Sequence, residues 1–486
     1  MRLYDSVFYA IAFFLFGIFL ASSGLSFLSV FLSAILASLI FLAIYFLRKE
    51  FPKKILIFSG FILFVAAGSF YFFIFQNYQK INSKIVYNRE IPFRGIVLDS
   101  NWNRITVDLQ KPLAGKISVI AKNNDFRYGD LVGFEGVIKQ ASSQNYNKDN
   151  LLGISSYPKA NLISQNNGSA FKSALISLRQ KIIGNFQKVL PYDQAAFLSG
   201  LTLGDQSEFS NDFKNAMSQS GTTHLVALSG YNISIIGIAI SVILGIFFSR
   251  RLTFILSIFA IFSFVLMTGA QASVVRAAIM GGIVLLAAQV NRIYSFRNAI
   301  AAAAFVMALG NPKILKFDIG FQLSFLALIG IVYLMPAVKK FFKVNDEKGI
   351  LDWKENFLTT VSAQLAVIPV LIRSFSNFSF ISIVANVLIL GFIPYTMTLG
   401  FILGAIGFIS YPLSLVFGWF VHIFLSYEIF VINFFGKINF FQIKNMSVIL
   451  MFVYYLALSG FVIYMKKPAR QLGNFNGGRS VAGGEK

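Results

Sequence analysis

Gly221-Thr-Thr-His-Leu-Val-Ala-Leu-Ser-Gly-Tyr-Asn-Ile233 is the stretch that decides the fold of this chain. It opens an apolar segment that runs to about Phe248, and a run of about 27 residues is long enough to cross a bilayer. Its first half nevertheless carries Thr, His, Ser and Asn side chains. Polar groups at membrane depth usually face a partner or a water-filled path, because lipid offers them no hydrogen bonds. A packing face of small residues is the alternative, and Gly230 stands where the helix can break.

The composition is typical of a polytopic α-helical membrane protein. Of the 486 residues, 56% are hydrophobic, and 56 are phenylalanine. Several apolar runs exceed the ~18 residues that mark a span, and we expect roughly 10–12 spans in all. Lys and Arg outnumber Asp and Glu by 42 to 20, which suits anionic lipid headgroups and also a polyanionic substrate. With no cysteine and two histidines we expect no metal and no cofactor, although oxygen ligands for Mg²⁺ are left open.

Basic residues predict the topology. Residues 1–75 hold three predicted spans, and the basic loop from Arg48 to Lys54 should lie in the cytoplasm by the positive-inside rule. With the amino terminus also inside, the third span delivers the chain to the outer face. The basic tail, residues 466–486, is predicted to be flexible and cytoplasmic.

Residues 76–165 are predicted to form a small β domain. Short runs alternate polar and apolar residues between glycine-containing turns, which is typical of a small barrel and suggests an OB-like fold outside the membrane. Such folds often bind single-stranded nucleic acid through basic and aromatic side chains, but the same residues are common on ordinary barrels. The candidates for guiding DNA are Arg94, Trp102, Arg104, Lys116, Arg127 and Tyr128.

The two regions that follow are predicted to be helical. In residues 166–221, apolar residues recur at helical spacing and basic residues lie off that stripe, which predicts amphipathic, interfacial helices. Asp205 is interpreted as a turn or capping residue. Residues 222–465 should form the transmembrane core, in which the Pro394-interrupted pair between Ser379 and Ser410 is predicted to be a re-entrant or broken element.

The run from Gly221 to Gly230 resembles the signature of the ComEC family, the inner-membrane channels of bacterial competence that import transforming DNA. Gly320-Phe-Gln-Leu-Ser324 and the segment around Arg276 resemble further motifs of that family. The chain departs from the pattern at Tyr231-Asn232, where the family usually has Leu-His. The resemblance implies a cell-membrane channel that carries single-stranded DNA inward. Its implied partners are DNA, lipid, a DNA receptor, a cytoplasmic translocase, a separate nuclease and further copies of the chain.

Seven residues are predicted to line the DNA path. They are Thr223, His224, Ser229, Asn232, Arg276, Asp318 and Gln322. Arg276 lies within an apolar segment, and Asp318 is the only acid between Thr222 and Pro336. Because a charge inside a membrane needs a partner or water, the two are expected to pair, unless each snorkels to an interface.

The chain is not expected to be an enzyme. Many family members carry a metallo-β-lactamase-like domain, but its His-x-His-x-Asp-His run does not occur in these 486 residues, and neither does a Walker phosphate loop. The alternative function is a secondary transporter of a small anionic solute, because such transporters also build their substrate sites from broken helices. An intramembrane hydrolase that pairs Ser229 with His224 is disfavoured, because residues five apart lie roughly 140° apart on an α-helix.

Overall fold

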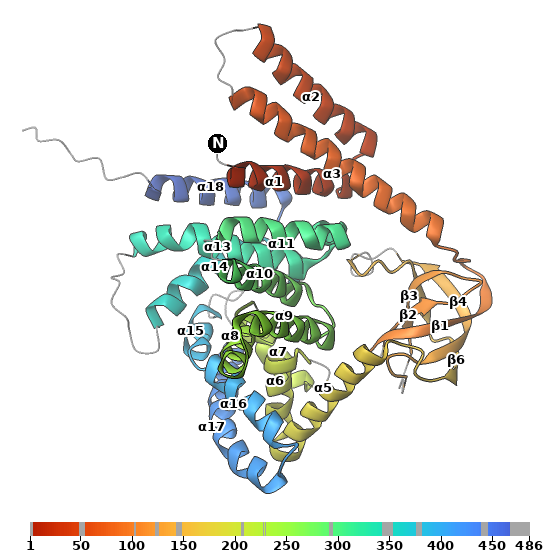
Figure 1. Ribbon diagram of the computed structural model, residues 1–486, viewed down its shortest axis with the longest axis vertical. Helices are drawn as coiled ribbons and strands as arrows, with labels where there is room; N and C mark the ends of the chain where they lie inside the picture. Colours follow the sequence, from red (N-terminus) through yellow and green to blue (C-terminus); the bar gives the residue numbers. More distant parts are fainter. Residues whose placement is uncertain are drawn as a thin grey trace, which may run out of the picture. The chain divides into compact units, whose positions relative to one another are not determined.

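The computed structural model describes residues 3–47, 54–101, 104–121, 126–141, 148–205, 209–226, 228, 230–290, 295–342, 353–375, 382–438 and 446–466. These residues form helices and a single six-stranded sheet (Figure 1). They divide into two compact units, one of residues 1–325 and 379–441 and the other of residues 326–378 and 442–486. The basic loop at 48–53 and the tail from 467 lie outside the described residues.

The first three helices pack closely because two of them meet at glycines. They are α1 (Leu3–Ser22), α2 (Phe27–Leu47) and α3 (Lys54–Asn82). A Cβ on Gly17 of α1 would lie 2.1 Å from the carbonyl oxygen of Val65 on α3, so only glycine permits this approach. Between α2 and α3 the buried hydroxyls of Ser38 and Ser59 lie 3.0 Å apart and hydrogen-bond. Small residues and hydroxyl pairs of this kind are the usual contacts between membrane helices.

The predicted barrel is present and closed. Its strands are β1 (Glu90–Asn101), β2 (Arg104–Leu109), β3 (Gly115–Ile120), β4 (Leu131–Gln140), β5 (Gly153–Ser156) and β6 (Lys159–Ser164). The strand order is β1-β2-β3-β5-β4, and β4 pairs back with β1 to close five strands, while β6 adds to the free side of β4. Alternate residues such as Ile105 and Val107 are fully buried, as the period-two pattern predicts. A closed five-stranded barrel of this size is consistent with an OB-like fold.

The first unit contains the following further helices, most of which surround one large apolar core. They are α5 (Ala170–Val189), α6 (Tyr192–Leu203), α7 (Asn211–Ser220), the 3₁₀ turn η1 (Thr223–Leu225), α8 (Gly230–Phe247), α9 (Arg250–Met267), α10 (Ala272–Gln289), α11 (Phe296–Gly310), α12 (Ile314–Phe317), the start of α13 (Ile319–Phe341), α15 (Ser382–Leu390), α16 (Ile393–Ile406) and α17 (Tyr411–Gly436). The predicted broken element is confirmed, because α15 and α16 meet at a bend of 52°. Pro394 lies in the first turn of α16, where its missing N–H costs nothing.

One helix of residues 166–221, α6, lies inside the helical core. Every residue of α6 from Gln194 to Leu203 is buried, and the helix packs against α5, α16 and α17. A helix that is covered on all sides belongs to a core, not to a membrane surface. Its composition allows this burial, because Asp193 is its only charged residue and lies in its first turn. The charged residues lie instead on the amphipathic helices α5 and α7.

The second unit is a helical group formed by the rest of α13 with α14 (Trp353–Phe375) and α18 (Val448–Lys466). Gly330 admits α14, because a Cβ there would lie 2.6 Å from Ala366. Tyr454 and Tyr455 of α18 each donate a hydrogen bond to a carbonyl oxygen of α14, at 2.7 Å and 3.0 Å. Among the described residues, nine helices are long and apolar enough to cross a membrane, or up to ten with the bent pair. The predicted class, a polytopic helical membrane protein with a small barrel domain, is confirmed.

Candidate functional site

The signature segment, residues 221–230, is not a continuous helix. Helix α7 ends at Gly221, whose φ of 69° lies in the left-handed region where glycine is favoured. There the backbone N–H of Thr222 donates to the carbonyl oxygen of Met217 at 2.9 Å. The 3₁₀ turn η1 follows, and α8 begins only at Gly230. The apolar segment therefore opens with irregular backbone, as the position of Gly230 predicted.

Neighbouring elements hold one side of the signature segment firmly. A Cβ on Gly221 would lie 2.3 Å from the Cβ of Ser382, so the end of α7 touches the first residue of α15. The hydroxyls of Ser220 and Thr222 are fully buried and lie 2.8 Å apart. Val226 and Leu228 are buried in the apolar core. This packing fixes the backbone of the segment.

Thr223 and His224 form the exposed side of the same segment. The Nδ1 atom of His224 lies 3.2 Å from the carbonyl oxygen of Gly221, a local bond that orients the ring and leaves Nε2 free of any partner in the described residues. Of the other predicted path residues here, Ser229 lies outside the described residues. Asn232 lies on α8, but its side chain is not described.

Helix α10 connects the signature segment to the second motif. The hydroxyl of Ser273 donates to the carbonyl oxygen of Leu228 at 2.5 Å. Arg276, one helical turn further, donates to the carbonyl oxygen of Ser324 in α13. The guanidinium carbon of Arg276 lies 5.7 Å from the centre of the Phe325 ring, a cation–π distance. Two segments nearly a hundred residues apart are thus joined through one turn of α10.

The expected ion pair between Arg276 and Asp318 is not formed; both residues are described, and neither is paired with the other. Asp318 instead accepts a bond from the backbone N–H of Phe321 at 3.1 Å, which caps the start of α13. Gln322 donates to the carbonyl oxygens of Leu315 and Lys316 at 3.0 Å and 2.8 Å. Both predicted path residues therefore stabilise the corner between α12 and α13.

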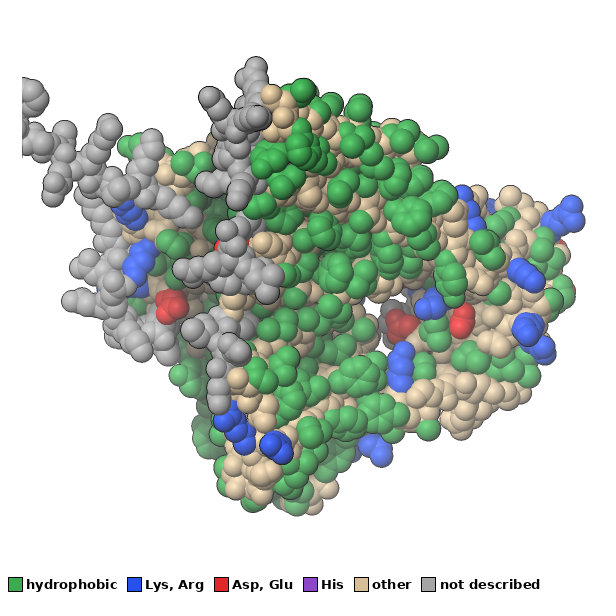
Figure 2. All heavy atoms as spheres, turned by 45° about the horizontal axis from the view of Figure 1, so that its top comes forward, with side chains coloured by type: hydrophobic (Ala, Val, Ile, Leu, Met, Phe, Trp, Pro, Cys, Tyr) green, Lys and Arg blue, Asp and Glu red, His purple; other side chains and the backbone are tan. Residues whose placement is uncertain are grey.

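A charged recess brings residues of the barrel and of the helices together. Asp149 is exposed, and the charges of Asp318, Arg104, Lys148 and Asp99 all act on it. Desolvation by the surrounding protein raises the pKa of Asp149, and the two nearby acids add to this, whereas the two basic groups lower it. A side chain that is accessible yet desolvated lies in a concave place. Figure 2 shows a hollow beside the barrel with acidic and basic side chains at its edge.

The recess is held by the connection between α11 and α13. Asn311 donates to the carbonyl oxygen of Lys148 at 2.6 Å, and the Nζ of Lys313 donates to Gln79 Oε1 at the end of α3, also at 2.6 Å. Burial lowers the pKa of Lys313. Arg104 and Asp318, which were predicted from separate arguments, therefore belong to one region of the surface.

The predicted DNA-guiding residues of the barrel are only partly grouped. Arg94, Arg104 and Lys116 alternate with buried residues on consecutive strands, so they share the outer face of β1, β2 and β3. Tyr128 is already engaged, because its hydroxyl accepts from the N–H of Ser169 at 3.2 Å and the Nζ of Lys172 lies 4.4 Å from its ring centre. Arg127 is exposed, and Trp102 lies outside the described residues.

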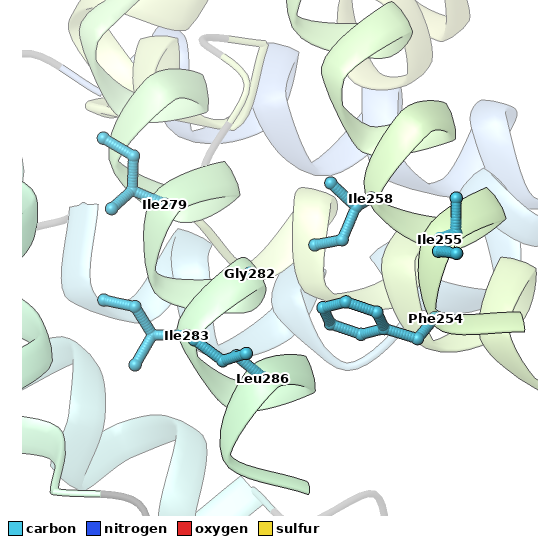
Figure 3. Close-up of a pocket in the computed structure, with 7 residues that line it drawn as sticks. All are labelled: Phe254, Ile255, Ile258, Ile279, Gly282, Ile283 and Leu286. Carbon is cyan, nitrogen blue, oxygen red and sulfur yellow. The ribbon is translucent and has the colours of Figure 1, made fainter. Parts of the chain in front are cut away.

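A pocket between α9 and α10 has the wrong chemistry for a polyanion. It encloses about 370 Å³ and is lined by Phe254, Ile255, Ile258, Ile279, Gly282, Ile283 and Leu286. Figure 3 shows these hydrocarbon side chains lying along the two helices with no polar group among them. Such a surface suits lipid chains, so we do not place DNA there.

Sequence reasoning overlooked a set of polar residues on α17. Glu428 is fully buried within this 26-residue apolar helix, and the acid in an apolar run was a visible signal. His422, on the same helix, contacts another helix, because its Nδ1 lies 2.7 Å from Gln194 Oε1 on α6. The amide of Gln194 also donates to the hydroxyl of Ser426 at 3.0 Å.

Asp205, interpreted as a turn residue, forms an ion pair with Arg179 at 3.2 Å.

These features define a multi-pass membrane protein in which a broken helix supports an irregular polar segment beside a small barrel. The family described as Competence protein matches residues 201–468, more than half of the chain, and the chain belongs to that family. The chain is 32% identical over 256 residues to "ComE operon protein 3" of Bacillus subtilis (strain 168), a match that covers 51% of this chain and 31% of the relative. The chain therefore spans less than a third of that relative. No solved structure matches. The resemblance to the ComEC family is confirmed.

Proposed function

We propose that this chain acts in DNA uptake during natural transformation and lines the path by which a single strand crosses the cell membrane. The observation that carries the proposal is the signature segment, which is anchored on one side by Gly221 and Leu228 and exposed on the other at Thr223 and His224. An irregular segment inside a helical core offers hydrogen-bonding groups that a regular helix satisfies internally. Membership of the Competence protein family supports DNA as the substrate.

The charge distribution is also suitable for DNA. The formal net charge is +22, and phosphates bind Lys, Arg and amide dipoles. Arg94, Arg104 and Lys116 on the outer barrel face would attract the strand, and Arg104 lies at the charged recess where the barrel meets the helices. In this proposal the barrel guides the strand to the recess. Strand degradation and the driving force come from other proteins, such as a nuclease and a cytoplasmic translocase.

The decisive experiment replaces His224 by alanine in a transformable strain. The side chain is exposed and makes one local bond, so its loss should cost only about 0.5–1.5 kcal/mol of stability. We expect normal abundance and a loss of DNA import. Import at the unaltered level would remove His224 from the path.

His422 provides the matched control, since the chain has only two histidines. His422→Ala leaves Oε1 of the buried Gln194 without its 2.7 Å partner, so it should lower abundance. Import per molecule of protein should then be unchanged. If both variants lose import in proportion to abundance, the effect of His224 is structural, and the proposed path is wrong.

Transport of a small anionic solute remains the second candidate. It is favoured by the bent pair α15–α16, because discontinuous helices form substrate sites in secondary transporters. Purified chain in vesicles separates the two functions. Entry of labelled oligonucleotide down its concentration gradient, without competition by short phosphate-containing solutes, supports the DNA path, whereas saturable solute uptake without DNA entry supports the transporter.

A further inference from the structure

Glu428 is the most completely buried acid among the described residues. Its side chain has no solvent exposure, and it lies within α17, a helix long enough to cross a membrane. One carboxyl oxygen, Oε1, lies 2.7 Å from Thr396 Oγ1 on α16. The other, Oε2, has no hydrogen-bond partner among the described residues. An ionised carboxylate with a single neutral partner in an apolar core is very costly, and such groups normally hold a proton.

The hydrogen bonds of Thr396 lead to the same conclusion by a separate route. Its hydroxyl is within bonding distance of two oxygens, Glu428 Oε1 at 2.7 Å and the carbonyl oxygen of Phe392 at 3.3 Å. A hydroxyl has one proton to donate, and a carbonyl oxygen can only accept. Each contact has a proton of its own only if Thr396 donates to Phe392 and Glu428 donates to Thr396; otherwise the single hydroxyl proton is shared between two acceptors. The first arrangement requires a proton on Oε1.

Among the described residues, no basic side chain forms an ion pair with Glu428. Helix α17 packs against α5, α6, α7, α15 and α16, and α15 and α16 contain no Lys, Arg, His, Asp or Glu. On α5, α6 and α7, Arg179 is in its ion pair with Asp205, and Asp193 lies in the first turn of α6. The other charged residues of these three helices are half-buried Lys172 and exposed Lys181, Lys188, Asp212 and Lys214. On α17 itself, His422 bonds Gln194, and Tyr427 donates to the carbonyl oxygen of Leu388 at 3.2 Å.

Thr396 lies in the first turn of α16, directly after the 52° bend from α15. We propose that Glu428 is a proton-binding site within the helical core, protonated while α16 and α17 are packed as observed, and that release of this proton separates the two helices at Thr396. An ionised Glu428 needs water or a cation, and in the packed arrangement its side chain has no contact with solvent. The bend supplies the joint about which α16 moves. The ligand of this site is the proton, and the site is independent of whether the substrate is DNA.

Infrared spectroscopy of the purified full chain in lipid bilayers tests the protonation directly. An un-ionised carboxyl has its own C=O stretching band, which an ionised one lacks. We expect this band at neutral pH, its loss in Glu428→Gln, and its retention in Glu135→Gln, whose carboxylate is on the barrel surface. Thr396→Val removes the acceptor and should shift the band without removing it, which keeps the test valid if Glu428→Gln does not fold. A wild-type spectrum without the band at neutral pH overturns the proposal.

A cysteine beside Thr396 tests the coupling to helix separation. Met397 is fully buried on α16, and the natural chain has no cysteine, so Met397→Cys reacts with a thiol reagent only when this region opens. If opening releases one proton, labelling should rise up to about tenfold per pH unit over the range in which the proton is lost. In the Glu428→Gln background labelling should stay constant. Equal pH dependence in both backgrounds overturns the coupling, and because neither measurement uses DNA, failure of the uptake proposal would not affect the result.

Discussion

Gly221→Ala is the substitution whose effect the structure defines best. Two penalties meet at this position. The φ of 69° is left-handed, which costs a residue with a Cβ about 1–2 kcal/mol. The new Cβ would also lie 2.3 Å from the Cβ of Ser382, and relieving such an overlap in a packed core costs about 1–3 kcal/mol. Together these predict a loss of about 2–5 kcal/mol in the free energy of unfolding.

Three further variants separate the two penalties. Gly269→Ala introduces only the backbone strain, since φ is 80° and nothing lies within 4 Å. Gly281→Ala, in α10 with nothing within 4 Å, introduces neither and should stabilise the helix by about 0.5–1 kcal/mol. Adding Ser382→Gly to Gly221→Ala removes the overlapping atom, because Ser382 Cα would be 3.5 Å from the new Cβ. We expect this second change to recover the overlap cost but not the strain.

The assay is reversible unfolding of the purified chain in mixed detergent micelles, with DNA import measured in parallel. Gly221→Ala should lower both, and Ser382→Gly should restore part of each. The reasoning is refuted if Gly221→Ala is as stable as the natural chain, or if Ser382→Gly makes it worse. Either result would mean that α7 and α15 do not meet at this glycine.

Three further predictions concern sidedness, DNA binding and chemistry. A cysteine at Lys159, whose side chain is 84% exposed on the barrel, should react with an impermeant reagent from outside the cell. A cysteine in the basic tail should react only after permeabilisation. The reverse pattern would contradict the predicted topology. Replacing Arg94 and Lys116 by alanine should reduce the salt dependence of single-strand binding by about 0.7 in log–log slope for each residue, whereas Lys159→Ala should not. The purified chain should leave labelled DNA intact with Mg²⁺ or Zn²⁺, because the described residues hold no group of three or more His, Cys, Asp or Glu side chains that could bind a metal ion; cleavage that co-purifies with the chain and responds to its mutation would contradict this.

Local patterns were sufficient for the elements that local physics determines. The barrel follows from alternation that places Ile105 and Val107 inside, and the broken pair follows from Pro394, which is favoured in the first turn of a helix. Gly221 and Gly230 mark the ends of the irregular segment, because glycine adopts backbone conformations that other residues disfavour. These features depend on the residue and its near neighbours in the chain.

Partners between distant segments could not be predicted from sequence. Arg276 was expected to seek a carboxylate, but it bonds the carbonyl oxygen of Ser324, and every residue has a carbonyl. Asp318 was unavailable because the start of α13 needs a cap. Helix α6 is too short to count as a span, so its complete burial emerges only from packing. His422 is similar, since its neighbour Gln194 precedes it by more than two hundred residues.

The way the barrel is inserted has a consequence for how the chain can be rebuilt. The first strand, β1, and the last, β6, both pair with β4, where Glu90 is opposite Val137 and Ser164 is opposite Leu131. The two ends of the insert are thus two strand spacings and six residues apart, a gap of about 20–25 Å. About seven extended residues span that distance. The barrel is therefore an exchangeable cassette: a short linker could replace it, or a different binding domain could take its place, without re-routing α3 or α5.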